Sequence, residues 1–137
     1  MPEPLRRPRG ILDTSVVIDL ELLDPGRLPI EVAVTAITMA ELAAGPHAAT
    51  DPVERARRQD RLQRAEAAFD PLPFDAAAAR VYGRVYAAVS SVGRKARRPR
   101  AVDLLVAAIA CGAGLPLYTR DVDDFRGLDG LIDVVAV

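Results

Sequence analysis

Two carboxylates stand alone in long apolar stretches of this 137-residue sequence. Glu41 is the only charged residue from Val32 to Thr50, with His47 taken as neutral, and Asp103 is the only one from 101 to 119. Burying an isolated carboxylate is costly, so such groups are normally paired with a cation, neutralised or bound to a metal ion. Neither stretch contains a cation. The partner of each carboxylate must therefore come from elsewhere.

Two further carboxylates, Asp13 and Asp121, each follow a short apolar segment that is typical of a buried strand. Groups just past the carboxyl ends of parallel strands converge on one crevice. Carboxylates gathered there would raise one another's pKa unless a cation lay among them, and their hard oxygen atoms suit Mg²⁺ or Mn²⁺. The pattern predicts a metal site that can activate water and neutralise the charge developing on a phosphodiester.

Each of the four carboxylates also has a structural interpretation. Glu41 would complete a capping box that begins at Thr38, and Asp103 would lie in the first turn of its helix, where the dipole favours an acid. Asp13 could cap the following helix or begin an Asx turn, and Asp121 could simply be solvated in an acidic turn. Their shared position at the ends of elements is what favours a common site.

Short apolar strands alternate with helical segments along the chain, which is typical of an α/β fold with a mainly parallel sheet. The strands are expected at 10–12, 32–34, 117–119 and 131–137, with a further short one possible at 72–74. The helices are expected at 14–23, 38–44, 51–69, 75–92 and 101–113. The length suits one domain over residues 1–137, with 1–9 as a flexible leader.

The composition narrows the classes of protein that remain. A net charge of −1 argues against coating nucleic acid by bulk electrostatics. The single cysteine, Cys111, excludes a disulfide framework and is expected to be a buried, inert thiol. No stretch approaches the ~18–20 apolar residues of a transmembrane helix, so a soluble, cytoplasmic protein is expected. One local run is strongly basic: Arg94, Lys95, Arg97, Arg98 and Arg100.

The motifs around the acids resemble a known family. They are Leu12-Asp13-Thr14-Ser15, Glu41 within Met39-Ala40-Glu41-Leu42, Asp103 opening an Ala-rich helix, and Thr119-Arg120-Asp121 followed by Asp124-Phe125. In this order they are similar to a PIN domain and, more narrowly, to a VapC-type toxin of a bacterial type II toxin–antitoxin pair. The resemblance runs from residue 11 to the C-terminus, and its most specific part is the interval from Asp103 to Asp121.

The resemblance implies a three-layer α/β/α sandwich with a central, mainly parallel sheet. It also implies a Mg²⁺- or Mn²⁺-dependent endoribonuclease that inhibits translation and growth, forms a homodimer and is silenced by a VapB-type antitoxin. It assigns Asp13, Glu41 and Asp103 as metal-binding acids and Asp121 as the fourth. The family often has Asn at this fourth position with an acid nearby, so Asp124 is the alternative. Hydrogen bonds from three hydroxyl residues would support these acids: Thr14, Ser15 and Thr119.

Metal-assisted hydrolysis of RNA would leave a 5′-phosphate and a 3′-hydroxyl. A ribonuclease that works through a pair of histidines is excluded, because His47 is the only histidine and is expected in a solvent-facing loop. The basic run would either be a solvated loop or position RNA phosphates beside the acids. The alternative function is a catalytically silent PIN-like module that binds RNA or a partner. A phosphoacceptor enzyme is disfavoured, because Ser15 stands where a second Asp would be needed.

Overall fold

The protein was analysed as a computed structural model, which describes residues 6–92 and 98–137, without the side chains of 98–100. Within these ranges four parallel strands form one sheet in the order β2-β1-β3-β4. The strands are β1 (Arg9–Leu12), β2 (Glu31–Ala33), β3 (Leu117–Thr119) and β4 (Val134–Ala136). The helices are α1 (Thr14–Ile18), α2 (Ala36–Ala48), α3 (Pro52–Ala68), α4 (Ala76–Ser91) and α5 (Arg98–Ala113). Three short 3₁₀ turns connect them: η1 (Leu20–Leu22), η2 (Pro25–Arg27) and η3 (Val122–Phe125).

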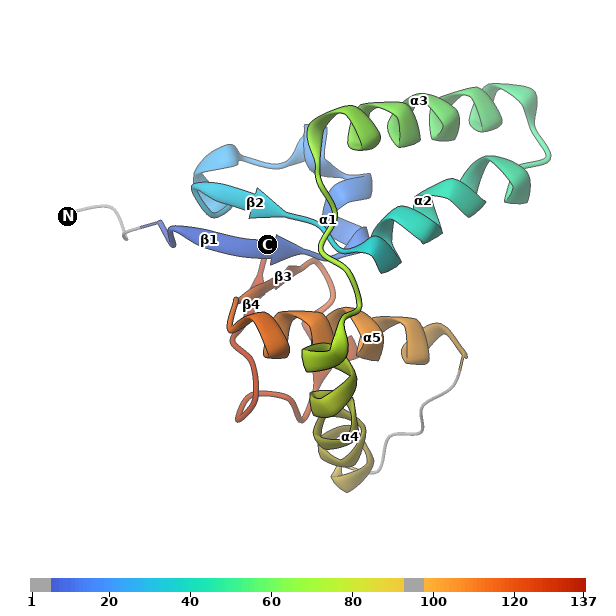
Figure 1. The fold of residues 1–137 in the computed structure, drawn as a ribbon. Coiled ribbons are helices and arrows are strands. Elements are labelled where there is room, and N and C mark those ends of the chain that lie inside the picture. Colours follow the sequence, from blue (N-terminus) through green and yellow to red (C-terminus); the bar gives the residue numbers. More distant parts are fainter. Residues whose placement is uncertain (1–5, 93–97) are drawn as a thin grey trace.

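The sheet has an apolar core on each of its faces. Side chains alternate across a strand, so Ile11 of β1 joins one core while Leu12 joins the other. In β3, Leu117 and Tyr118 divide in the same way. The first core is covered by α4 and α5, and α1, α2 and α3 cover the second (Figure 1). The predicted three-layer α/β/α sandwich is confirmed.

Helix α5 is the central helix of the first core. Leu104, Ala107, Ala108 and Ala110 are fully buried, which explains the nearly all-apolar sequence of this helix. It starts at Arg98, three residues earlier than predicted. Pro99 is compatible with that start, because a helix's first turn contains N–H groups that have no intrahelical partner.

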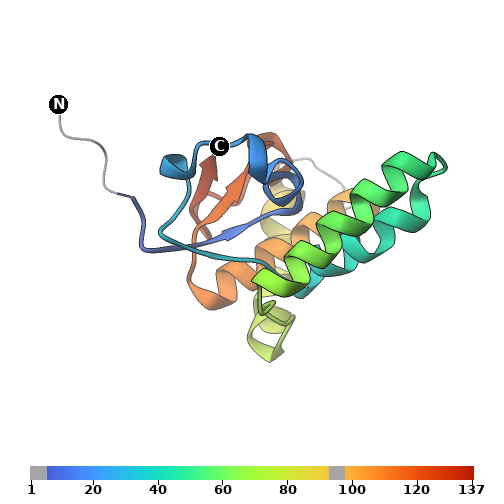
Figure 2. The same cartoon turned by 90° about the horizontal axis from the view of Figure 1, so that it is seen from above.

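Helices α2 and α3 form an antiparallel hairpin that projects beyond the sheet (Figure 2). The start of α3 follows the prediction closely. Asp51 accepts a hydrogen bond from the Glu54 amide at 3.0 Å, and Pro52 occupies the first turn. The end predicted for the preceding helix was wrong, because α2 continues through Pro46 to Ala48. Only two helical residues follow this proline, so its missing N–H disrupts no more than the last turn.

Three other predicted boundaries also need correction. The helix expected over 14–23 is broken at Asp19, after which the chain forms η1. The segment 72–74 contributes one bridge, between Leu72 and Thr35, instead of a strand. The last strand is limited to β4, because the Leu131 and Ile132 amides bond back to the Leu128 carbonyl in a turn.

The chain before β1 contacts the folded body. Arg6 donates to the carbonyls of Leu28 and Pro29 at 3.1 and 3.3 Å, and Arg7 forms an ion pair with Asp133. Arg9, assigned to the leader in the sequence analysis, is the first residue of β1. None of the helices in the described ranges is long and apolar enough to cross a membrane.

The Tyr118 ring packs directly over the backbone of Gly10 at the centre of the sheet. A Cβ atom at Gly10 would lie 2.5 Å from one ring carbon of Tyr118. Tyr118 is 3% exposed, and this burial raises the pKa of its hydroxyl, while the positive charge of Arg7 opposes the shift. Its altered pKa thus reflects burial in the core.

Two glycine-to-alanine substitutions should change the free energy of unfolding in opposite directions. Gly10→Ala should lower it by roughly 1–3 kcal/mol, because the added methyl group overlaps the Tyr118 ring. Gly83→Ala, in the exposed middle of α4 with no atom near the new methyl group, should raise it by roughly 0.5–1 kcal/mol. Urea denaturation of both variants tests this packing, and a stable Gly10→Ala protein would contradict it.

Candidate active site

Asp13 is held at the point where β1 ends and α1 begins. Its amide donates to the Tyr118 carbonyl at 3.0 Å, which ties it to β3. Its Oδ1 atom accepts from the Ser15 hydroxyl at 2.5 Å and from the Val16 amide at 3.2 Å. The predicted cap interpretation is therefore confirmed. Capping uses only Oδ1, one of the two carboxylate oxygens of Asp13.

The second oxygen of Asp13 is without a hydrogen-bond donor among the residues that the structure describes. Asp13 is only 6% exposed, so solvent compensates this oxygen poorly. A buried carboxylate oxygen without a donor is energetically unfavourable unless a cation or a water molecule satisfies it. Asp13 is therefore suited to bind a cation.

Glu41 is exposed on α2, and α1 orients it. Thr14 Oγ1 donates to Glu41 Oε1 at 2.6 Å and also lies 3.0 Å from Thr38 Oγ1. The capping box predicted for Glu41 is wrong, because the helix begins earlier and Thr35 caps it by accepting from the Thr38 amide at 3.1 Å. Glu41 lies in the second turn and has no capping role.

Asp103 is half-buried on α5, and its first-turn interpretation is also wrong. Because the helix starts at Arg98, Asp103 lies in the second turn, where the dipole effect has largely decayed. Val106 and Ala107, one turn further along the same side, are buried at 2% and 0% exposure. Asp103 therefore lies on a side of α5 that faces the interior.

Asp121, the predicted fourth acid, follows β3. Asp121 is exposed, and its amide donates to the buried Thr119 hydroxyl at 3.0 Å, so Thr119 fixes the backbone at this point. The Asp121 side chain makes no capping hydrogen bond to η3. Asp124, the alternative fourth acid, is half-buried within η3.

Ser15 links Asp13 to the segment after β3. Its hydroxyl donates to Asp13 and accepts from the Arg120 amide at 3.2 Å. The Arg120 guanidinium in turn binds Asp19 at 2.8 Å, at the end of α1. Sequence reasoning did not assign Arg120 or Asp19 to the site. Arg120 lies inside the recognised motif, but nothing in the sequence indicates its distant partner.

The donor chemistry of these acids fits a hard divalent cation such as Mg²⁺ or Mn²⁺. Among the described residues Asp13 has one buried oxygen without a donor, and Glu41 has an exposed carboxylate that accepts a hydrogen bond from Thr14. Over the described ranges, no three His, Cys, Asp or Glu side chains lie close enough together to bind one metal ion. A cation bound here would have to draw the carboxylates toward one another.

The remaining predicted residues are those of the basic run, the single histidine and the single cysteine. Arg94, Lys95 and Arg97 fall outside the described residues, and Arg98 and Arg100 belong to the first turn of α5 instead of a loop. His47 is exposed as predicted but lies in the last turn of α2. Cys111 is partly buried, and its Sγ lies 3.7 Å from the Leu131 carbonyl oxygen.

Comparison with known proteins identifies the class. Residues 11–131 match the family model of the PIN domain, and the chain therefore belongs to that family. It is similar to two proteins of Mycobacterium tuberculosis (strain ATCC 25618 / H37Rv). It is 41% identical to Ribonuclease VapC5 over 128 residues, which are 91% of each chain. It is 33% identical to Ribonuclease VapC4 over 118 residues, which are 84% of this chain and 88% of the relative.

The fold agrees with that classification. The structure matches a chain in the crystal structure of VapBC-5 from Mycobacterium tuberculosis, a member of the VapBC family of toxin–antitoxin systems, with a TM-score of 0.83 and 39% identity. The match covers 95% of this chain and 99% of the other. The predicted resemblance to a VapC-type PIN domain is confirmed.

Two substitutions of Asp13 should separate its capping role from its charge. Asp13→Ala removes the acceptor for Ser15 and Val16 and should lower the free energy of unfolding by about 1 kcal/mol. Asp13→Asn keeps an oxygen at the cap position and should stay within about 0.5 kcal/mol of the parent, since Asn caps as well as Asp. Thermal or urea denaturation measures the difference. Equal losses in both variants would show that the charge, not the cap, stabilises this turn.

Proposed function

We propose that this protein is a metal-dependent endoribonuclease and the toxin of a VapBC-type toxin–antitoxin pair. The observation that carries the proposal is Asp13, a buried carboxylate with one oxygen fixed by α1 and the other without a donor among the described residues. The similarity to Ribonuclease VapC5 across most of both chains supports RNA as the substrate.

The residues that would hold the cation are Asp13, Glu41 and Asp103, with Asp121 or Asp124 as a fourth acid. Asp13 and Asp121 follow two adjacent strands, and Thr14 connects α1 to Glu41, which supports a shared site. When bound, Mg²⁺ or Mn²⁺ would supply the Lewis acidity that activates water and stabilises the phosphate charge.

The protein's own groups position these acids. Ser15 holds Asp13 in one orientation, Thr14 holds Glu41, and Thr119 fixes the backbone of Asp121. The sequence contains no second histidine, so His47 cannot work as half of an acid–base pair. Hydrolysis by water should leave a 5′-phosphate and a 3′-hydroxyl on the RNA.

The biological setting follows from the same relatives. VapBC-5 is named as a toxin–antitoxin system, which supports an antitoxin of the VapB type as the partner of this chain. We infer a homodimer that acts in the cytoplasm, where its RNA substrates are. A small reading frame beside the gene, encoding an antitoxin-like protein, would support this pairing.

RNA cleavage by purified protein tests the activity. The wild type should cut RNA with Mg²⁺ or Mn²⁺ and stop when a chelator is added, and Asp13→Asn and Asp103→Asn should each lower the rate by roughly a hundredfold or more. Asp70→Asn, at an exposed acid between α3 and α4, is the matched control and should cut normally. Wild type that binds RNA but never cleaves it would instead support the silent RNA-binding module.

Metal binding can be measured without catalysis. Mn²⁺ should raise the melting temperature of the wild type, because a ligand that binds only the folded state stabilises it. Glu41→Gln and Asp103→Asn should reduce this shift. Asp121→Asn and Asp124→Asn identify the fourth acid: the variant with the smaller shift marks the ligand. If Mn²⁺ shifted all four variants as much as the wild type, the acids would not be metal ligands.

A further inference from the structure

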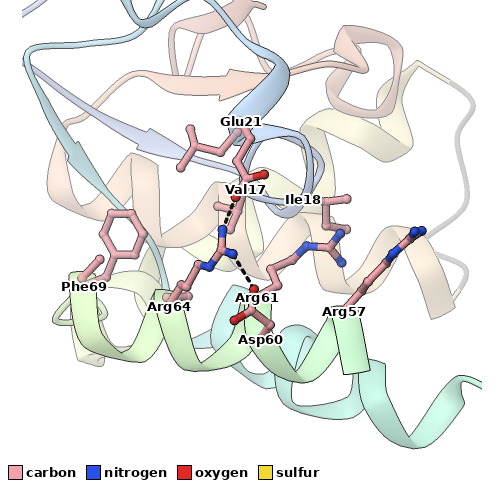
Figure 3. A pocket seen from close by; sticks show the side chains of 11 residues that line it. Val17, Ile18, Glu21, Arg57, Asp60, Arg61, Arg64 and Phe69 are labelled. Atoms are coloured by element: carbon pink, nitrogen blue, oxygen red, sulfur yellow. Dashed lines mark hydrogen bonds and ion pairs between the residues drawn. The ribbon is translucent and has the colours of Figure 1, made fainter. Parts of the chain in front are cut away.

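A groove runs between α1 and α3 and continues to the candidate active site. Its outer part, a cavity of about 420 Å³, is lined by apolar residues from both sides, including Val17 of α1 and, from α3 and its end, Ala65 and Phe69. Figure 3 shows Val17 and Phe69 in this lining. Its inner part, about 340 Å³, is lined by Thr14 and Glu41 together with residues of α3. Ile18 and Arg61 line both parts. Arg61 therefore lines both the outer cavity and the inner cavity that contains Glu41.

Three arginines of α3, Arg57, Arg61 and Arg64, line the outer groove, and they differ in their pairing (Figure 3). Arg64 is bound by Glu21 and by Asp60, and Arg57 lies 4.0 Å from Glu54. In the inner part, Arg58 donates to Glu54 at 3.1 Å and to the Gly45 carbonyl at 3.0 Å.

Arg61 differs from all of these. Within the described ranges it forms no ion pair and no side-chain hydrogen bond, although it is half-buried. A partly desolvated guanidinium without an acceptor retains its capacity for charge-assisted bonds. Its planar fork of donors matches the oxygens of a phosphate, which it can bind at two points.

The position of the Arg61 charge suits an RNA phosphate better than the carboxylate of an acidic peptide. The carboxylates of Asp13 and Glu41 would repel an approaching RNA strand, so a cation beside them is needed to hold the neighbouring phosphate. Arg61 is the groove cation that shares a cavity with Glu41 and is not already neutralised by a described acid. The outer cavity is open and partly apolar, as is suitable for an unstacked base next to that phosphate.

We propose that Arg61 is a positioning residue that binds an RNA backbone phosphate adjacent to the cleaved one, and that single-stranded RNA enters the site along the α1–α3 groove. This inference rests on the proposed ribonuclease function. Arg61 does not touch the reacting atoms. It sets where the strand lies, while Asp13 and Glu41 act at the cleaved bond.

Binding of a short fluorescent single-stranded oligoribonucleotide, measured by anisotropy over a range of salt concentrations, tests the proposal. The measurement uses the Asp13→Asn background, so that cutting does not interfere. Adding Arg61→Gln should weaken binding by roughly tenfold and reduce the slope of log K against log salt by about 0.7, the value for one lost phosphate contact. Arg61→Lys should recover most of the slope but only part of the affinity.

The matched control is Arg84→Gln, which removes the same charge from an exposed position on α4, on the opposite side of the sheet (Figure 1). It should leave both affinity and slope unchanged. In the cleaving protein, Arg61→Gln should raise KM more than it lowers kcat, as expected for lost binding. A thermal melt of each variant checks folding, because a misfolded protein would lose its cooperative transition. Recovery of RNA binding in Arg61→Lys is an independent check that the position tolerates substitution.

Unchanged RNA affinity and slope in Arg61→Gln would overturn the proposal, even if the wild type cleaves RNA normally. The same holds if Arg61→Gln weakens binding of polyglutamate but not of RNA, since the groove would then serve an acidic protein partner. If Arg61→Gln weakens RNA binding but the wild type cuts no RNA with either metal, the result supports the phosphate-binding role of Arg61 and contradicts the proposed nuclease activity.

Discussion

The site depends on the turn at Asp13, where a single residue joins the sheet to its first helix. Its amide donates to the Tyr118 carbonyl, its Oδ1 atom caps α1, and its Oδ2 atom has no hydrogen-bond donor among the residues that the structure describes. Because the cap holds one oxygen, the direction of the other is fixed before any ligand arrives. Such fixed geometry is what a metal site requires of its acids. Ser15 extends this control to β3, since its hydroxyl also accepts from the Arg120 amide.

Sequence reasoning located what local chemistry determines. Asp51 followed by Pro52 predicts the start of α3, and the apolar run after Asp103 predicts a buried helix. It failed where a local signal competes with tertiary packing. Gly45-Pro46 looks like a helix end, yet α2, which packs against α3, continues to Ala48, two residues beyond Pro46. The apolar spacing over 14–23 suits a helix, but the chain breaks at Asp19, whose side chain binds the guanidinium of Arg120.

The acids themselves were predictable, but their partners were not. Glu41 and Asp103 are conspicuous in sequence because each is the only charge in a long apolar stretch. The structure removes the capping-box and first-turn interpretations by moving both helix starts upstream. The hydrogen bond between Thr14 and Glu41 spans 27 positions, and the contact between Arg120 and Asp19 spans 101. Contacts at such separations are set by the topology of the sheet, which one sequence specifies only indirectly.

The ion pairs of α3 show how a chain with a net charge of −1 can still attract RNA. The Arg64 and Glu21 side chains are 64% and 78% exposed, so their pair contributes at most about 1 kcal/mol to stability. Its larger effect is geometric, because it joins α3 to η1 across the groove and neutralises Arg64 there. Glu54 pairs with Arg58 one turn further along α3 itself. With Arg58 and Arg64 paired to acids, Arg61 is the cation without a described acid partner in the cavity that Glu41 also lines. A local cation of this kind can guide a strand to an acidic site without making the whole surface basic.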